Sequence, residues 1–229
     1  MGKIKYIFIF LLIGLVDLFA GNRYEIKSGI VEYEIAGNAE GTEKGDTISG
    51  TSKLYFKDFG NLELTDERII QTIMGEKEEE RTVSKIVNDK MLTADFNDEV
   101  IYSQKLVLDE ENPIQNIKTY DSFIQMGAKN LGTEEILGYK CDIWQLGEDK
   151  IWVYKSVPLK QISQSLGIIQ IQQAKFAVFN IDIKDDKFKL PPFPIKPIEE
   201  IIGDSEAEFP NISPEQEKMM NEMMKEPKK

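Results

Sequence analysis

The chain has 229 residues and a formal net charge of −12, with no histidine and a single cysteine. The lack of histidine removes the commonest general base and the commonest metal ligand of proteins. One cysteine excludes an internal disulfide and the zinc sites built from Cys and His. A strongly acidic chain also repels the phosphates of nucleic acid. We therefore expect no cofactor, no metal and no nucleic-acid partner, while 41% apolar residues predict a folded core.

Residues 1–20 predict a secretory signal peptide. Lys3 and Lys5 precede an apolar run from 6 to 16, and a short exit ends at Ala20, after which we expect cleavage. The run is shorter than the roughly 20 apolar residues that cross a bilayer. Removal of two lysines and Asp17 takes away a net +1, so the mature chain would carry −13 instead of −12. An uncleaved membrane anchor is the alternative.

The residues that follow alternate with a period of two, which predicts β-strands. Val31, Tyr33 and Ile35 share one face of the first strand, and Glu32 and Glu34 occupy the other, so one side of this strand is solvated. Further strands are expected at 49–60, at 61–74 as one or two strands, and at 81–87, 90–96 and 99–104, with an acidic bend at 75–80. This pattern predicts a meander of hairpins.

One helix is predicted over residues 112–130. Asn112 can cap it, Pro113 can take its first position, and Gly127 lies near its end. Its apolar residues recur at helical spacing, namely Ile114, Ile117, Tyr120 and Ile124. We expect this stripe to lie on the sheet.

The stretch 131–160 contains the only cysteine and both tryptophans. It reads as a hairpin with a turn at 147–150 and apolar residues on both faces, which predicts a central position in the sheet. Cys141 is interpreted as a small core residue between Tyr139 and Ile143, because free cysteine is commonly buried. A nucleophilic cysteine would need a base or a helix N-terminus beside it, and Lys140 projects to the opposite face.

The aromatic residues of this region suggest an apolar cavity. Trp144, Trp152 and Tyr154, together with Phe176 or Phe179 of a long strand within 168–183, could line a pocket for lipid or acyl chains. Alternatively, the predicted helix fills this space and leaves a dry core.

The C-terminal region has a different character. Prolines within 187–194 predict the end of the folded domain, which would span 21–194, and residues 195–229 form an acidic, methionine-rich tail. Ser213 can cap a short amphipathic helix whose apolar stripe could bind a partner. That stripe consists of Met219, Met220, Met223 and Met224. A thioether site for monovalent copper is a less favoured interpretation of the same residues.

The order of motifs in 131–194 resembles a family of bacterial periplasmic proteins related to the lipoprotein-carrier (LolA-like) superfamily. The resemblance rests on LGTEEILGYKCDIWQL, then KIWVYKSVPLK, then QQAKFAVFNIDI and KFKLPPFP. It implies a mainly β (α+β) fold, a curved antiparallel open half-barrel with one or two covering helices, located in the periplasm of a Gram-negative envelope. No site residue of the carriers can be matched to this chain.

These observations favour a non-enzymatic exported protein that binds a lipid or a lipidated partner in the concave face. The alternative is an interaction module with a self-filled core, which docks an envelope protein through its acidic surface or methionine-rich tail. Catalysis by paired carboxylates is not expected, because the acidic clusters fall in polar loops where solvated charge is usual. None of these loops has the spacing of a calcium site.

Overall fold

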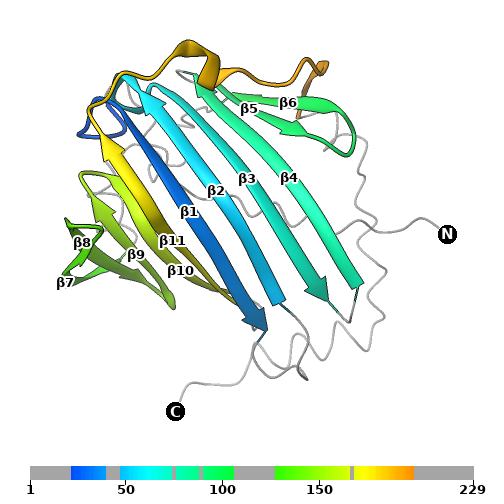
Figure 1. The fold of residues 1–229 in the computed structure, drawn as a ribbon. Helices are drawn as coiled ribbons and strands as arrows, with labels where there is room; N and C mark the ends of the chain where they lie inside the picture. The colour runs from blue at the N-terminus through cyan, green and yellow to red at the C-terminus, as the bar shows by residue number, and fades with distance from the viewer. Residues whose placement is uncertain are drawn as a thin grey trace.

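The computed structural model describes residues 22–39, 47–73, 76–87, 90–105, 127–165 and 168–198. These residues form one curved sheet of twelve strands in the order β12-β6-β5-β4-β3-β2-β1-β11-β10-β9-β8-β7 (Figure 1). Neighbouring strands are antiparallel, except that β12 pairs with β6 in parallel. The prediction of a mainly β, curved and open sheet is confirmed.

The strands are β1 (Gly29–Ala39), β2 (Thr47–Lys57), β3 (Leu62–Ile73), β4 (Glu76–Val87), β5 (Lys90–Asp95), β6 (Val100–Lys105), β7 (Lys129–Ile136), β8 (Tyr139–Leu146), β9 (Asp149–Tyr154), β10 (Val157–Ser165), β11 (Ile168–Phe179) and β12 (Ile195–Pro197). Two short 3-10 helices, η1 (Asp58–Gly60) and η3 (Asp185–Phe188), lie between strands.

The first strands follow the predicted alternation. Val31, Tyr33 and Ile35 of β1 are buried, while Glu34 is exposed. The segment predicted as one or two strands is the single strand β3. The expected acidic bend at 75–80 was wrong, because Glu76–Glu80 is the first half of β4. This half pairs residue by residue with β3, and the backbone ladder outweighs the low strand preference of glutamate.

Three predicted segments fall largely outside the described residues. They are the signal peptide at 1–20, the helix over 112–130 and the tail with its methionine stripe. Only the end of the helical prediction can be compared, and it was wrong there, since Lys129 and Asn130 begin β7. Gly127 precedes them in a turn with φ +82°, a conformation that glycine adopts readily.

The hairpin of β8 and β9 is not central, as its two apolar faces had suggested, but lies next to the β7 edge. On one of its faces Trp144 and Val153 pack with Ala128 and Ile151. Its other face, which carries Cys141 and Trp152, packs in the largest hydrophobic cluster because the sheet curls over it. Local packing and curvature, instead of a central place in the strand order, therefore explain why both faces are apolar.

The inner, concave face carries the largest hydrophobic cluster of the described residues. Tyr139 of β8 reaches Phe179 of β11, with ring centroids 5.0 Å apart, although β9 and β10 lie between these strands. Such contacts form only where a sheet bends toward itself. The buried members of this concave core come from seven strands and the N-terminal segment: Ile26, Val31, Tyr33, Leu54, Phe56, Ile136, Cys141, Trp152, Val157, Leu159 and Ala174.

The outer, convex face carries the second core. Residues 181–194, which we call the strap, run from β11 across the upper ends of β2 to β5 (Figure 1). Ile183 and Phe188 of the strap are buried against Leu64, Val83 and other residues of the sheet. The proline-rich segment thus packs on the sheet before β12 pairs with β6.

The N-terminal segment 22–28 closes one end of the concave face. The amide of Tyr24 donates to the Phe59 carbonyl at 2.9 Å, and the amide of Glu25 donates to the Lys155 carbonyl at 3.3 Å. These bonds link the end of β2 to the turn between β9 and β10. Arg23 forms a buried ion pair with Glu63, which also accepts a hydrogen bond from the Tyr24 hydroxyl at 2.7 Å.

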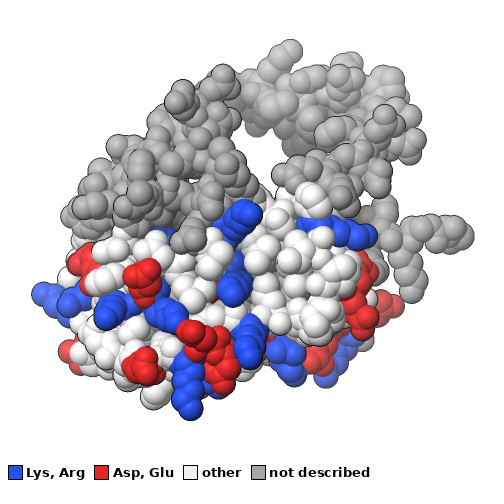
Figure 2. Space-filling view, turned by 90° about the horizontal axis from the view of Figure 1, so that it is seen from above, with Lys and Arg blue, Asp and Glu red and all other residues white. Residues whose placement is uncertain are grey.

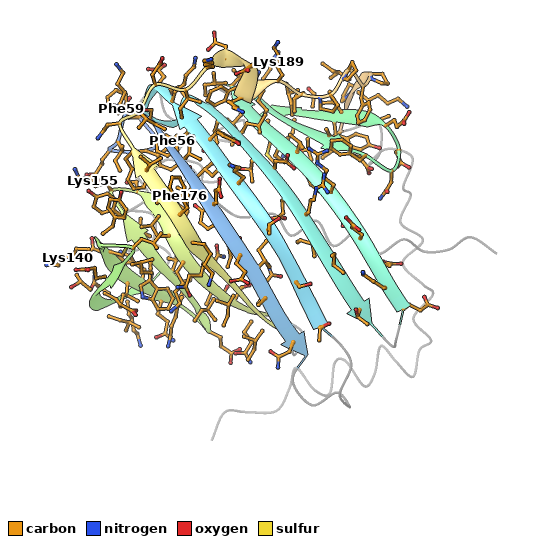
Figure 3. The ribbon with its side chains drawn as sticks, in the orientation of Figure 1. Phe56, Phe59, Lys140, Lys155, Phe176 and Lys189 are labelled. Carbon is orange, nitrogen blue, oxygen red and sulfur yellow. The ribbon has the colours of Figure 1, made fainter. Side chains whose placement is uncertain are left out.

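Two phenylalanines offer a matched test of this architecture (Figure 3). Phe56 is fully buried in the concave core, whereas Phe176 is 48% exposed on β11. Phe56→Ala should lower the free energy of unfolding by about 3–5 kcal/mol, because it removes apolar contact and leaves a cavity. Phe176→Ala should cost less than about 1 kcal/mol. Urea unfolding measured by circular dichroism compares them, and equal losses would contradict the assigned core.

Candidate functional site

The concave face of β11 and β1 to β5 is lined by rows of side chains that lie at the same level on adjacent strands. Residues directly opposite each other in a ladder share a face, so the register defines these rows. The upper row is Ala174, Tyr33, Ser52, Glu67, Thr82 and Asp95; the middle row is Gln172, Ile35, Gly50, Ile69 and Glu80; the lower row is Gln170, Gly37, Ile48, Gln71 and Glu78.

The centre of these rows is apolar. Ile35, Ile48 and Ile69 form a separate buried cluster with exposures of 1%, 7% and 7%. Gly50 lies between Ile35 and Ile69 in the middle row, and a Cβ there would come within 2.3 Å of the Arg68 carbonyl oxygen. Glycine therefore allows β2 and β3 to approach closely beneath the isoleucine cluster.

Two buried polar groups border the isoleucine cluster without a hydrogen-bond partner. Ser52 is 2% exposed and Gln170 is 8% exposed, and neither the Ser52 hydroxyl nor the Gln170 carbonyl oxygen is paired. A buried polar atom that makes no hydrogen bond costs about 1–3 kcal/mol. Groups of this kind, on an apolar surface, are those that a bound molecule can satisfy.

Glu67 of the upper row is the most perturbed carboxylic acid of this face. Burial raises its pKa from 4.5 to about 7, and the nearby Glu80 carboxylate adds to the rise. The adjacent Ser52 hydroxyl partly offsets the rise, although the two side chains are not aligned for a hydrogen bond. The pKa of Glu80 is raised as well, by its own burial and then by Asp95 and Glu78.

The raised pKa of Glu67 makes stability depend on pH. The folded protein retains the Glu67 proton between pH 4.5 and pH 7, where the unfolded chain has lost it. Stability therefore falls as pH rises through this window, by about 3 kcal/mol in total. Glu67→Gln cannot ionise, so it should be more stable than the wild type at pH 8 by up to about 3 kcal/mol and similar to it at pH 4.

Urea unfolding of both proteins at the two pH values measures this difference. Glu79→Gln is the matched control, because Glu79 is an exposed glutamate on the convex side of the same strand as Glu80. Its effect on stability should be the same at pH 4 and pH 8. If Glu67→Gln retained the pH dependence of the wild type, Glu67 would not be the group responsible.

The aromatic residues predicted to share one cavity are divided by the structure. Trp152, Tyr154 and Phe179 come together on the concave side, where Tyr154 and Phe179 have ring centroids 5.6 Å apart. Trp144 lies in a separate cluster with Val153, on the face that the register carries through Ile151 and Gln161 to Gln172 of the middle row. Phe176 is exposed on the convex side and therefore does not line the concave face.

Sequence reasoning missed the residues of the rows themselves. In LELTDERIIQ the strand alternates Glu63, Thr65, Glu67 and Ile69 on one side with Leu62, Leu64 and Asp66 on the other. Both sides mix apolar and charged residues, so the pattern does not reveal which one faces inward. The available signal was the change from charged residues at 66–68 to Ile69 and Ile70, together with the glycine within β2.

Cys141 lies in the concave core, as predicted. Its side chain is fully buried, and its thiol contacts the Tyr139 carbonyl oxygen at 3.4 Å. Burial raises the pKa of the thiol to about 11, and Asp142 and Glu134 add to the rise. This position suits a packing residue and not a nucleophile.

We predict that Cys141 does not react with a water-soluble thiol reagent in the folded protein. The thiol is shielded, and its thiolate is a minor species at neutral pH. One equivalent of thiol should react with Ellman's reagent only after urea unfolding. Rapid labelling of the native protein at pH 8 would show that Cys141 is accessible.

A hollow of about 380 Å³ lies on the convex side between the strap and the sheet. Arg81 lines this hollow and donates two hydrogen bonds to the Asp66 carboxylate, at 2.8 and 3.0 Å. Its guanidinium lies 4.5 Å from the centre of the Phe96 ring. Lys187 and Lys189 of the strap are exposed. The hollow is thus a gap beside the strap, and its lining Arg81 is already paired with Asp66.

Within the described part of the chain, no three His, Cys, Asp or Glu side chains are arranged to hold a metal ion. No described helix has the length and apolar character needed to span a bilayer.

Comparison with known proteins yields matches of structure only. No protein-family model and no curated protein sequence matches this chain. An uncharacterised conserved protein from Thermus thermophilus matches with TM-score 0.41 and 8% identity, over 73% of this chain and 90% of its own. The structure of MucB matches with TM-score 0.40 and 11% identity, over 79% of this chain and 61% of MucB.

A LolA superfamily protein from Nitrosomonas europaea matches with TM-score 0.33 and 12% identity, over 73% of this chain and 92% of its own. A further match is described as the domain of a putative outer membrane lipoprotein-sorting protein from Vibrio parahaemolyticus. At these scores the matches carry no functional argument. The structures to which the chain is similar include LolA-like proteins, the class that its sequence motifs resemble.

Proposed function

We propose that this protein is a non-enzymatic, exported binding protein of the envelope that holds an apolar or amphiphilic ligand in the concave face of its sheet. The observation that carries this proposal is the isoleucine cluster of β1, β2 and β3, bordered by the unpaired polar atoms of Ser52 and Gln170. An apolar surface with a few unsatisfied polar groups is the usual composition of a ligand site.

The aromatic part of the concave core acts as the end wall of this site. Tyr139, Tyr154 and Phe179 pack with ring centroids 4.8 to 5.6 Å apart, so this end is filled by the protein's own side chains. Trp152 and Tyr154 would then report on binding from the edge of the site. The ligand would lie over the rows between this wall and β5.

Export supports the same function. The signal peptide predicted at 1–20 would deliver the chain to the periplasm, where an apolar molecule needs shielding from water. A sheet that curves around an apolar centre provides such shielding without any catalytic group.

The proposal is tested on mature protein purified from a bacterial periplasm without detergent. Native mass spectrometry followed by organic extraction should reveal a bound apolar molecule in the wild type. Ile69→Thr keeps a β-branched side chain but places a hydroxyl in the apolar centre, so the bound fraction should fall about tenfold.

Ile70→Thr is the control, because Ile70 neighbours Ile69 in sequence but points to the convex face. It should retain the ligand of the wild type. Circular dichroism confirms that both variants are folded. A wild-type protein that is free of ligand after purification, and that takes up no added amphiphile, would overturn the proposed function.

A further inference from the structure

Basic residues of the central strands are confined to one face of the sheet. Among the described side chains of β1 to β6 and β11, every Lys and Arg lies on the convex side. They are Lys53, Lys57, Arg68, Lys77, Arg81, Lys85, Lys90 and Lys175, the last placed there by its ion pair with Glu34. Several are paired there with acids, as Lys53 is with Glu32 and Lys175 with Glu34. Blue and red side chains accordingly lie side by side along the lower border of the described surface in Figure 2.

The concave side of the same strands carries acidic side chains and none of these basic side chains. Glu67 on β3, Glu80 on β4 and Asp95 on β5 form a line across the rows, each near the next. Asp95 accepts hydrogen bonds from the amides of Asn97 and Asp98, so it is partly used by the turn after β5. Glu67 and Glu80 are the two glutamates of this line nearest to the isoleucine cluster.

Segment 22–28, which closes one end of the concave face, does not neutralise the charge of these three acids. Arg23 is the buried cation there, and it is paired with Glu63. The row of Thr65 lies between Glu63 and Glu67 along β3. Among the described residues of these strands, the concave face therefore offers a ligand negative charge and hydrogen-bonding groups, but no cation.

A second observation concerns the serine beside this line. Ser52 is directly opposite Glu67 in the upper row, is 98% removed from solvent, and has an unpaired hydroxyl. A serine hydroxyl accepts a hydrogen bond, and a glutamate accepts one when it is ionised. Together they present acceptors beside an apolar surface, which complements a donor-rich, positively charged group attached to an apolar chain.

We propose that the ligand of the concave face is a cationic amphiphile whose ammonium group is held by Glu67 and Ser52 while its apolar chain lies on Ile35, Ile48 and Ile69. This inference rests on the proposed function and specifies its ligand class. It excludes fatty acids as preferred ligands, because their carboxylate would face Glu67 and Glu80 without a counter-charge. An uncharged chain would leave the acceptors unsatisfied.

The test uses three probes with the same twelve-carbon chain, dodecylamine, dodecanol and dodecanoate, at concentrations below micelle formation. Isothermal titration calorimetry at pH 8 measures their affinities for the full mature chain. Dodecylamine should bind at least about tenfold more tightly than dodecanoate, with dodecanol between them.

Glu67→Gln keeps the shape of the side chain but removes its charge. It should reduce the preference for the amine over the carboxylate by about tenfold. Glu79→Gln removes the same charge from the convex face and should leave all three affinities unchanged. Circular dichroism and urea unfolding establish that each variant is folded.

The outcomes separate the two proposals. If none of the three probes binds, the proposed function fails, and the ligand class fails with it. If dodecanoate or dodecanol binds as tightly as dodecylamine, the concave face binds amphiphiles but the cationic preference is wrong. If the amine is preferred but Glu67→Gln and Glu79→Gln lower the preference equally, the selectivity comes from overall charge, and Glu67 is not the binding group.

Discussion

The unbroken register from β1 to β6 is the constraint on which the rest of the structure depends. No bulge interrupts these ladders, so each residue keeps one face along its whole strand. The register shifts instead fall between β1 and β11, between β9 and β10, and between β7 and β8. Bulges increase local twist, and here they accompany the half of the sheet that curls around the aromatic core. One half of the sheet thus fills itself, while the other presents an ordered concave surface.

That division also explains how much could be predicted from the sequence. Strand positions and the buried face of β1 follow from alternation, because Val31, Tyr33 and Ile35 are separated by glutamates. The sequence could not show whether Trp144 and Trp152 line the same cavity. They lie on the two strands of a hairpin, and the face that each one occupies depends on the register of those strands. In β3 and β4 both faces carry charges, and only the strand neighbours decide that Glu67 faces inward and Asp66 outward. The site residues were therefore less predictable than the fold.

Acidic side chains that lack basic neighbours on the concave face destabilise the fold, and Glu67 is the clearest case. Opposite charges on the convex face compensate each other, as in the Arg81–Asp66 pair, and solvent screens the remainder. The concave carboxylates have no such compensation, and burial next to Glu80 keeps Glu67 in the range where it gains and loses a proton near neutral pH. Residues that destabilise a fold in this way mark positions where binding can return the lost free energy.

The two edges of the sheet limit how these molecules can associate with one another. At one edge, β12 adds three residues to β6 and ends at Pro197, which has no amide hydrogen to donate. At the other, β7 is almost entirely exposed, but it contains a register shift between Asn130 and Gly132 and adjacent charges at Glu134 and Glu135. Bulges, charged residues and prolines prevent one sheet from extending into the next. The two edges of this curved sheet therefore disfavour strand pairing between one molecule and the next.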